Sequence, residues 1–246
     1  MFGGCVKSSR AIAFIFVCAI CVVSGLARAN TNGQVSQLSG TLSVQKPDGS
    51  IRILSQRSDI QSGDTINTQR DSYAQIRFPD GAQITLKPNT TVKIEAFNFT
   101  EAEPQRDNFI FGLLKGGLRA VTGLVGKRGN ADAYKLGTAT ATIGIRGTTF
   151  GADDCSGAAS GQGGCGGLPS AVYVSVSDGE VVATNNAGSV SFLAGQFGQI
   201  ENRDRLPRFL SSDPGLQFTP PASFIQSISG GTALNTGKSM ECVVRR

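Results

Sequence analysis

The sequence predicts an all-β fold, in which short hairpins form a compact β-sandwich or β-solenoid-like roll with an irregular C-terminal tail. Three observations support it. Apolar and polar residues alternate over short segments, Asp-Gly pairs recur between these segments, and no window of a dozen residues shows helical spacing. The 32 glycines and the 17% charged residues also favour many turns over long helices, and 246 residues suffice for an independent core.

Residues 1–29 predict a cleavable signal peptide. Two basic residues precede the apolar run 11–23, and alanines follow at positions 27 and 29, where signal peptidase requires small side chains. We expect cleavage between Ala29 and Asn30. The apolar run is shorter than the roughly 20 residues of a permanent membrane helix. The mature chain is therefore expected to be periplasmic or secreted without a permanent membrane span, an uncleaved anchor being the alternative.

The mature chain carries almost balanced charge. The signal peptide removes Lys7, Arg10 and Arg28 from a total of 23 basic residues, which leaves 20 basic and 18 acidic residues. No cluster of lysines and arginines is interleaved with aromatic residues, as a groove that follows a phosphate backbone would need. We therefore expect no nucleic-acid partner.

The clearest strand pattern lies between residues 73 and 94. In the segment 73–78, alternate residues are apolar, as a half-buried strand requires. Asp80-Gly81 then turns the chain, because glycine adopts positive φ without steric cost. The same alternation resumes over 82–86 and continues over 92–94, which predicts a hairpin or meander.

Two further Asp-Gly pairs predict the same strand-turn-strand unit. Asp48-Gly49 separates the apolar alternation of 42–44 from that of 51–53, and Asp178-Gly179 separates 172–176 from Val181. Repeated aspartates also fit a metal site or carboxylate catalysis. A structural turn is the favoured interpretation, because aspartate before glycine hydrogen-bonds the nearby backbone and tolerates left-handed φ.

The remaining segments define the expected boundaries. The acidic stretch 98–107 is expected to be an exposed connection, and strand character resumes over 109–114 and 118–121 around a Gly-Gly pair. The Gly/Ala/Ser-rich stretch 151–170 is expected to be a flexible insertion that does not build the sheet. We place the folded domain at 30–203 and an irregular tail at 204–246.

Cysteine positions predict one disulfide. Three of the six cysteines belong to the signal peptide, which leaves Cys155, Cys165 and Cys242. In an oxidising compartment Cys155 and Cys165 can close a short glycine-rich loop, which contributes roughly 2–3 kcal/mol. Cys242 is then unpaired or bonded to another molecule.

The segment 144–148 suggests an irregularity within a strand. Gly144 and Gly147 flank Arg146 inside a β pattern, which favours a bulge or close backbone packing. The guanidinium of Arg146 can pair with a carboxylate or with backbone carbonyls. The alternative is a guanidinium that faces a partner.

Together these segments resemble the FecR family of bacterial extracytoplasmic domains. The chain has the family's Gly-Asp-x-x-x-Thr turn at 63–68, its Asp-Gly hairpin at 80–81 and its A-x-[IV]-G-[IV]-R-G-T-x-F stretch at 141–150, in order and with matching spacing. We expect a mainly structural role for the residues of these motifs and of the following hairpin: Gly63, Asp64, Thr68, Asp80, Gly81, Gly144, Arg146, Gly147, Thr148, Phe150, Asp178 and Gly179.

The resemblance implies an all-β periplasmic domain. In the best-known members this domain relays a signal between an outer-membrane transporter and a cytoplasmic sigma factor. The present sequence shows no cytoplasmic anti-sigma region and no internal transmembrane helix, so we expect a free-standing member. For such a member the resemblance supports export and protein interaction rather than the relay itself.

Several classes of chemistry are disfavoured by composition. The chain contains no histidine, which excludes Ser-His and Cys-His nucleophile pairs, and three mature cysteines do not make a zinc site. The glycines of 161–166 fit a dinucleotide-binding pattern, but Pro169 follows where that motif needs a helix. Carboxylate pairs remain: Asp178 with Glu180, or Asp153 with Asp154, which also suits weak calcium binding.

We therefore predict a non-catalytic, exported protein-interaction or regulatory module of the bacterial cell envelope, without a cofactor. An envelope protein is the expected partner, which binds a sheet face or an exposed edge strand. The alternatives are a carbohydrate- or cell-wall-binding module, which the absence of tryptophan weakens, and a carboxylate-based hydrolase.

Overall fold

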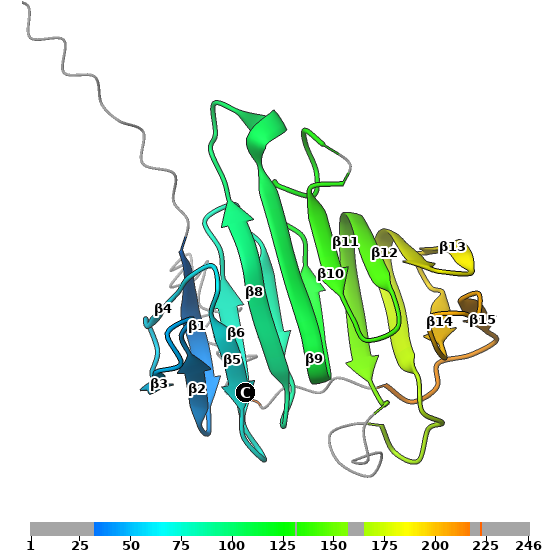
Figure 1. Cartoon of the computed structure of the whole chain (residues 1–246), viewed down its shortest axis with the longest axis horizontal. Helices are drawn as coiled ribbons and strands as arrows, with labels where there is room; N and C mark the ends of the chain where they lie inside the picture. Colours follow the sequence, from blue (N-terminus) through cyan, green and yellow to red (C-terminus); the bar gives the residue numbers. More distant parts are fainter. Residues whose placement is uncertain (1–31, 131, 157–164, 217–221, 223–246) are drawn as a thin grey trace, which may run out of the picture.

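The computed structural model describes residues 32–130, 132–156, 165–216 and 222, and its described part is almost entirely β-structure (Figure 1). The predicted signal peptide with its Ala29–Asn30 cleavage site, and Cys242, lie outside the described residues. The strands are β1 (Gly33–Ser39), β2 (Leu42–Gln45), β3 (Ile51–Leu54), β4 (Asp59–Ile60), β5 (Thr65–Thr68), β6 (Tyr73–Arg77), β7 (Gln83–Leu86), β8 (Thr91–Asn98), β9 (Asn108–Val121), β10 (Tyr134–Gly137), β11 (Thr142–Asp154), β12 (Val172–Asn185), β13 (Gly188–Leu193), β14 (Phe197–Ile200) and β15 (Arg208–Leu210). The predicted all-β class is confirmed.

The only helical element with assigned bounds in the described ranges is the short 3-10 helix η1 (Pro104–Arg106), which lies in the connection between β8 and β9. No helix of the described residues combines the length and the apolar character needed to cross a membrane.

The predicted hairpin over 73–86 is formed by β6 and β7. Ala74 and Ile76 are buried, as the two-residue alternation requires, and the pairing runs from Ala74 opposite Leu86 to Arg77 opposite Gln83. In the turn, an Asp80 carboxylate oxygen accepts the backbone N–H of Ala82 at 3.0 Å. Local sequence chemistry therefore suffices to position this unit.

All fifteen strands belong to one open sheet, which divides at β9. Residues 108–115 of β9 pair with β8, whereas residues 118–121 pair with β7 on the same edge. The strand changes partner at Gly116, whose φ is +80°. A Cβ atom there would lie 2.7 Å from the Cα atom of Thr90, so only glycine fits the crossing. The Gly-Gly pair thus marks a change of partner within one continuous strand.

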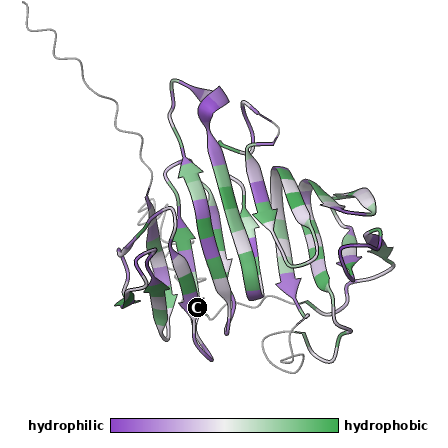
Figure 2. Ribbon diagram, viewed as in Figure 1, coloured by the Kyte–Doolittle hydropathy of each residue, from purple (hydrophilic) through white to green (hydrophobic). Residues whose placement is uncertain are grey.

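The two branches that leave β9 have the order β8-β5-β2-β3 and β7-β6-β1-β4. Their inward faces supply side chains to one hydrophobic core, as in the packed layers of a sandwich. Leu42, Ile66 and Val92 enter this core from the first branch, and Val35 and Ile84 enter it from the second. Apolar and polar residues alternate along these strands in Figure 2.

The other half of the sheet extends from the far edge of β9. β10 pairs with β9 in parallel, β11 pairs antiparallel with both β9 and β12, and β12 pairs with β13 and β14. β15 follows β14 and adds three residues of strand inside the segment 204–246, which was predicted to be irregular. The sheet therefore ends at β15 on this side (Figure 1).

Two predictions about the long strands are wrong. Asp178-Gly179 is not a hairpin turn, because β12 continues through it with a register shift, and Gly179 has a φ of +79°. Residues 151–154 do build the sheet, as the end of β11. The glycine-rich composition concealed this strand end, which depends on pairing with β9 and β12 rather than on its own side chains.

Candidate functional site

The first FecR-like motif stabilises the start of β5. Gly63 has a φ of +90°, and the buried Asp64 carboxylate accepts hydrogen bonds from Lys46 Nζ at 2.9 Å and from the Gln61 N–H at 2.8 Å. The hydroxyl of Thr68 donates to the carbonyl of Lys87 at 2.6 Å. These contacts join strands within the fold.

Asp80, in the second motif, is buried between the β6–β7 turn and the segment after β9. Its carboxylate accepts the N–H groups of Ala82 and Val125, the latter at 3.3 Å, and burial raises its pKa. The nearby Tyr134 hydroxyl is buried without a hydrogen-bond partner among the described residues, and its pKa is raised by burial and, second, by Asp80. Asp80 and Tyr134 are both buried, so we assign the pair to the core.

The third motif forms the predicted bulge in β11. The register against β12 shifts between Arg146 and Thr149, and Gly147 has a φ of +59°. Thr148 is buried, and its N–H donates to the Thr122 hydroxyl at 3.0 Å. The Arg146 side chain is 57% exposed and lies 4.0 Å from Glu180, so it faces solvent beside a single carboxylate.

The two proposed carboxylate pairs lie in β12 and β11. Asp178 and Glu180 lie on opposite sides of the β12 irregularity, and the Glu180 carboxylate accepts a hydrogen bond from Ser191. Asp153 and Asp154 are neighbours in β11 and face opposite sides of the sheet. In the described part of the chain, no three histidine, cysteine or acidic side chains gather where they could hold a metal ion. Residues 161–164 of the dinucleotide-like pattern lie outside that part.

A buried ion pair connects Lys87, the residue after β7, to Asp153 of β11 across β9. Lys87 Nζ lies 2.6 Å from Asp153 Oδ1, and the two side chains are only 6% and 2% exposed. Gly117 of β9 lies between them, and a Cβ atom there would collide with the Asp153 carboxylate. Burial raises the Asp153 pKa, while the charge of Lys87 opposes that change. The ion pair therefore holds these strands together on the face of the sheet opposite the hydrophobic core, which is the outer face.

The segment after β15 crosses over this ion pair. The carbonyl of Leu216 accepts a hydrogen bond from Lys87 Nζ at 3.3 Å, and the Leu216 side chain packs in a second apolar cluster with Tyr173 and the Cys155–Cys165 disulfide. The predicted disulfide is therefore present, with its Cα atoms 5.7 Å apart. It ties the end of β11 to the segment that precedes β12.

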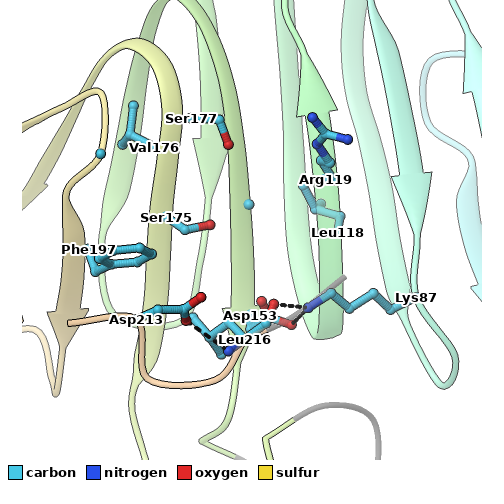
Figure 3. Close-up of a pocket in the computed structure, with 12 residues that line it drawn as sticks. Lys87, Leu118, Arg119, Asp153, Ser175, Val176, Ser177, Phe197, Asp213 and Leu216 are labelled. Atoms are coloured by element: carbon cyan, nitrogen blue, oxygen red, sulfur yellow. Dashed lines mark hydrogen bonds and ion pairs between the residues drawn. The ribbon is translucent and has the colours of Figure 1, made fainter. Parts of the chain in front are cut away.

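A groove of about 410 Å³ adjoins the ion pair on the outer face (Figure 3). Its walls include Arg119 from β9 and Ser175 from β12, and Asp213 and Leu216 belong to the crossing segment. Sequence reasoning missed this groove, because its residues are spread over some 130 positions of the chain. No local pattern distinguishes them.

At the opposite end of the molecule, β3 is an edge strand. β3 pairs only with β2, and the bond from the Lys46 N–H to the Ser50 carbonyl begins their ladder. Bonded and non-bonded pairs alternate in an antiparallel ladder. The backbone groups of Arg52 and Leu54 therefore point to β2, and those of Ile51 and Ile53 point to the open edge.

The side chains of this edge are unusually apolar for an exposed strand. Ile51 is 68% exposed and Ile53 is 70% exposed, on the face opposite the core. Arg52 stands between them, is exposed and forms no ion pair in the described part of the structure. The alternation over 51–53 was predicted as a strand, but its edge position follows only from the long-range pairing.

Comparisons with known proteins found a matching family model and similar solved structures. Residues 64–182 match the family model described as FecR protein. Two crystal structures of a "putative anti-sigma factor" from Parabacteroides distasonis ATCC 8503 are 14% and 15% identical, cover 61% of this chain and 60% of that one, and have TM-scores of 0.44. A "cell surface anchoring domain" is 28% identical over 26% of this chain and 84% of its own, with a TM-score of 0.25.

The comparison with curated proteins gave no match. The Gly-Asp turn, the Asp-Gly hairpin and the arginine bulge nevertheless occupy the positions that the sequence resemblance implied. The family match covers all three motifs except Gly63. Residues 64–182 of this chain therefore match the FecR family, over just under half of its length.

Proposed function

We propose that this protein is a non-catalytic protein-interaction and regulatory module of the bacterial cell envelope, which binds its partner by strand addition at β3. The observation that carries the proposal is the open edge at Ile51 and Ile53. Their backbone N–H and C=O groups face away from β2, and their side chains are the two most exposed large apolar groups among the described residues. An added strand would hydrogen-bond these backbone groups and also cover the two side chains.

The chemistry of the edge indicates what kind of segment it accepts. An extended partner segment with apolar residues beside Ile51 and Ile53 buries surface that water now covers. A carboxylate across from Arg52 would pair with its guanidinium. Antiparallel pairing of β3 with β3 of a second copy would instead bring two Arg52 side chains together, which disfavours self-association. The proposed partner segment is therefore apolar and acidic.

The envelope location rests on three features. The sequence predicts a signal peptide over residues 1–29, the FecR resemblance implies an extracytoplasmic domain, and the Cys155–Cys165 disulfide suits an oxidising compartment. These features support export. Fractionation of cells that produce the full-length chain, with N-terminal sequencing of the mature protein, tests both the compartment and cleavage before Asn30.

A backbone-specific substitution tests strand addition. Ile53→Pro removes an N–H that the fold does not use, and proline is tolerated in edge strands. Ile53→Val keeps this N–H and most of the apolar surface. The full-length protein is cross-linked in intact cells, and its partners are identified by mass spectrometry.

We expect Ile53→Val to retain the cross-linked partner and Ile53→Pro to lose it, while both variants keep the wild-type far-UV circular dichroism. Recovery of the same partner by both variants would exclude β3 as the contact. Failure of the wild-type protein to cross-link any envelope protein would contradict the interaction function itself.

A further inference from the structure

A row of residues crosses the outer face of the sheet from β9 to β14. Arg119 lies opposite Gly151, Gly151 lies opposite Ser175, and Ser175 lies opposite Phe197. All four line the groove described above, and Figure 3 shows the labelled side chains of Arg119 on β9, Ser175 on β12 and Phe197 on β14. The row therefore has the Arg119 guanidinium at one end and the Phe197 ring at the other.

Gly151 leaves a position in the middle of this row without a side chain. A Cβ atom at Gly151 would approach the Ser175 hydroxyl to 2.7 Å, so any larger residue would fill the space between the strands. Without a side chain at Gly151, the groove stays open as a trough between Arg119 on one side and Ser175 on the other. Its volume of about 410 Å³ falls in the range of small-molecule sites, which is about 300–1,000 Å³.

Three polar side chains of the groove are available for a ligand, whereas Lys87 and Asp153 pair with each other and Asp213 accepts the N–H groups of Gly215 and Leu216. Within the described ranges, the Arg119 guanidinium forms no ion pair or side-chain hydrogen bond, and the same is true of the hydroxyls of Ser175 and Ser177. Phe197 is half-buried and makes no ring contact with another described aromatic residue. The Arg119 guanidinium, two serine hydroxyls and the Phe197 ring thus lie in one groove.

We propose that this trough binds a small carboxylate with an apolar substituent. The guanidinium of Arg119 presents parallel N–H donors that match the two oxygens of a carboxylate. The hydroxyls of Ser175 and Ser177 can donate further hydrogen bonds to the same group, and the substituent lies against Phe197. The ligand site is independent of strand addition at β3 and would remain if that proposal failed.

The carboxylate and its apolar substituent can belong to a free organic acid or to the carboxyl terminus of a peptide. We would titrate the mature protein with phenylacetate, with its uncharged analogue phenylacetamide, and with the peptide Ala-Ala-Phe, and follow the backbone amide signals of Gly151 and Ser175 by NMR. Phenylacetate is expected to shift these signals saturably, and phenylacetamide is expected to bind about tenfold more weakly. Tighter binding of Ala-Ala-Phe than of phenylacetate assigns the site to peptide termini, and the reverse assigns it to free acids.

Arg119→Gln and Arg77→Gln form a matched pair of variants, because each removes one exposed arginine from the sheet surface. Arg119→Gln should weaken phenylacetate binding about tenfold and abolish the preference for the acid over the amide. Arg77→Gln, far from the trough in β6, should change neither. Equal binding of acid and amide by the wild-type protein, an unchanged preference in Arg119→Gln, or no saturable binding at millimolar phenylacetate would each overturn the proposal.

Discussion

The two ends of the sheet differ in how strongly other contacts reinforce them. At the β11–β15 end, a disulfide, an ion pair and the crossing segment 211–216 tie the strands together on the outer face. At the β3 end, the ladder stops at a strand whose isoleucines and backbone groups face solvent. Exposed edges invite pairing with other chains, so natural proteins usually block them with charge, proline or a cover.

This contrast indicates that the two ends of the sheet have different roles. The reinforced end holds the geometry of long, bulged strands, whose pairing spans many positions of the chain. Strand β3 itself carries one charge, Arg52, and no proline, so it lacks most of the usual protection. We interpret the first end as a structural anchor and the second as a surface for a partner. The predictions below test each side of this comparison.

Substitution of Lys87 by methionine should have the largest effect. It leaves the Asp153 carboxylate buried without its counter-ion, which typically costs about 3–5 kcal/mol of unfolding free energy. The double variant Lys87→Met/Asp153→Leu removes both charges and should be closer to the wild-type protein. Urea unfolding of the three proteins measures this, and a double variant no more stable than Lys87→Met would contradict the account.

The same variant should show a characteristic pH dependence. Burial already raises the Asp153 pKa above its ordinary value of 3.8, and loss of Lys87 removes the charge that opposes this shift. A raised carboxyl pKa favours the protonated folded state, so stability falls as the pH rises from 3.8 through the folded pKa. The deficit of Lys87→Met should therefore be small in acid and largest at neutral pH. A deficit independent of pH would show that Asp153 is not the group concerned.

Removal of the disulfide should have an intermediate effect. Cys155→Ser/Cys165→Ser is expected to cost about 2–3 kcal/mol, because the bond restricts the unfolded chain over a short loop. Reduction of the wild-type protein should produce the same loss. Thermal unfolding with and without reductant checks this, and an unchanged melting temperature would remove the disulfide from the anchor.

The β3 edge should contribute least to stability. Ile53→Ala is expected to change the unfolding free energy by no more than about 0.5 kcal/mol, because the side chain is already exposed. Ile66→Ala in β5 is the matched core substitution and should cost about 2–5 kcal/mol. Comparable losses in the two variants would mean that Ile53 is covered within the protein.

Local patterns predicted much of the fold. Alternation and turn chemistry identified the β6–β7 hairpin, and two glycines around Arg146 identified the bulge in β11. The same logic failed at Asp178-Gly179, because a residue with positive φ occurs both in hairpin turns and in bulges. Which of the two forms depends on the partner strand, since β11 continues to pair with β12 on both sides of the irregularity.

The candidate sites were less accessible to sequence reasoning for a related reason. Lys87 and Asp153 are 66 positions apart and meet only because β9 brings β7 and β11 together. The strand at Ile51–Leu54 was visible as an alternation, but nothing local shows that one of its edges stays unpaired. Predicting either site requires the order of strands in the sheet, which short-range patterns do not contain.

Amide hydrogen exchange of the isolated mature protein tests the central claim most directly, because it compares neighbouring residues of β3. The account predicts rapid exchange of the Ile51 and Ile53 N–H groups, which face the open edge, and slower exchange of the Arg52 and Leu54 N–H groups, which bond to β2. Equal protection of Ile53 and Arg52 in the isolated protein would show that the edge is already occupied and would contradict its assignment as a binding surface.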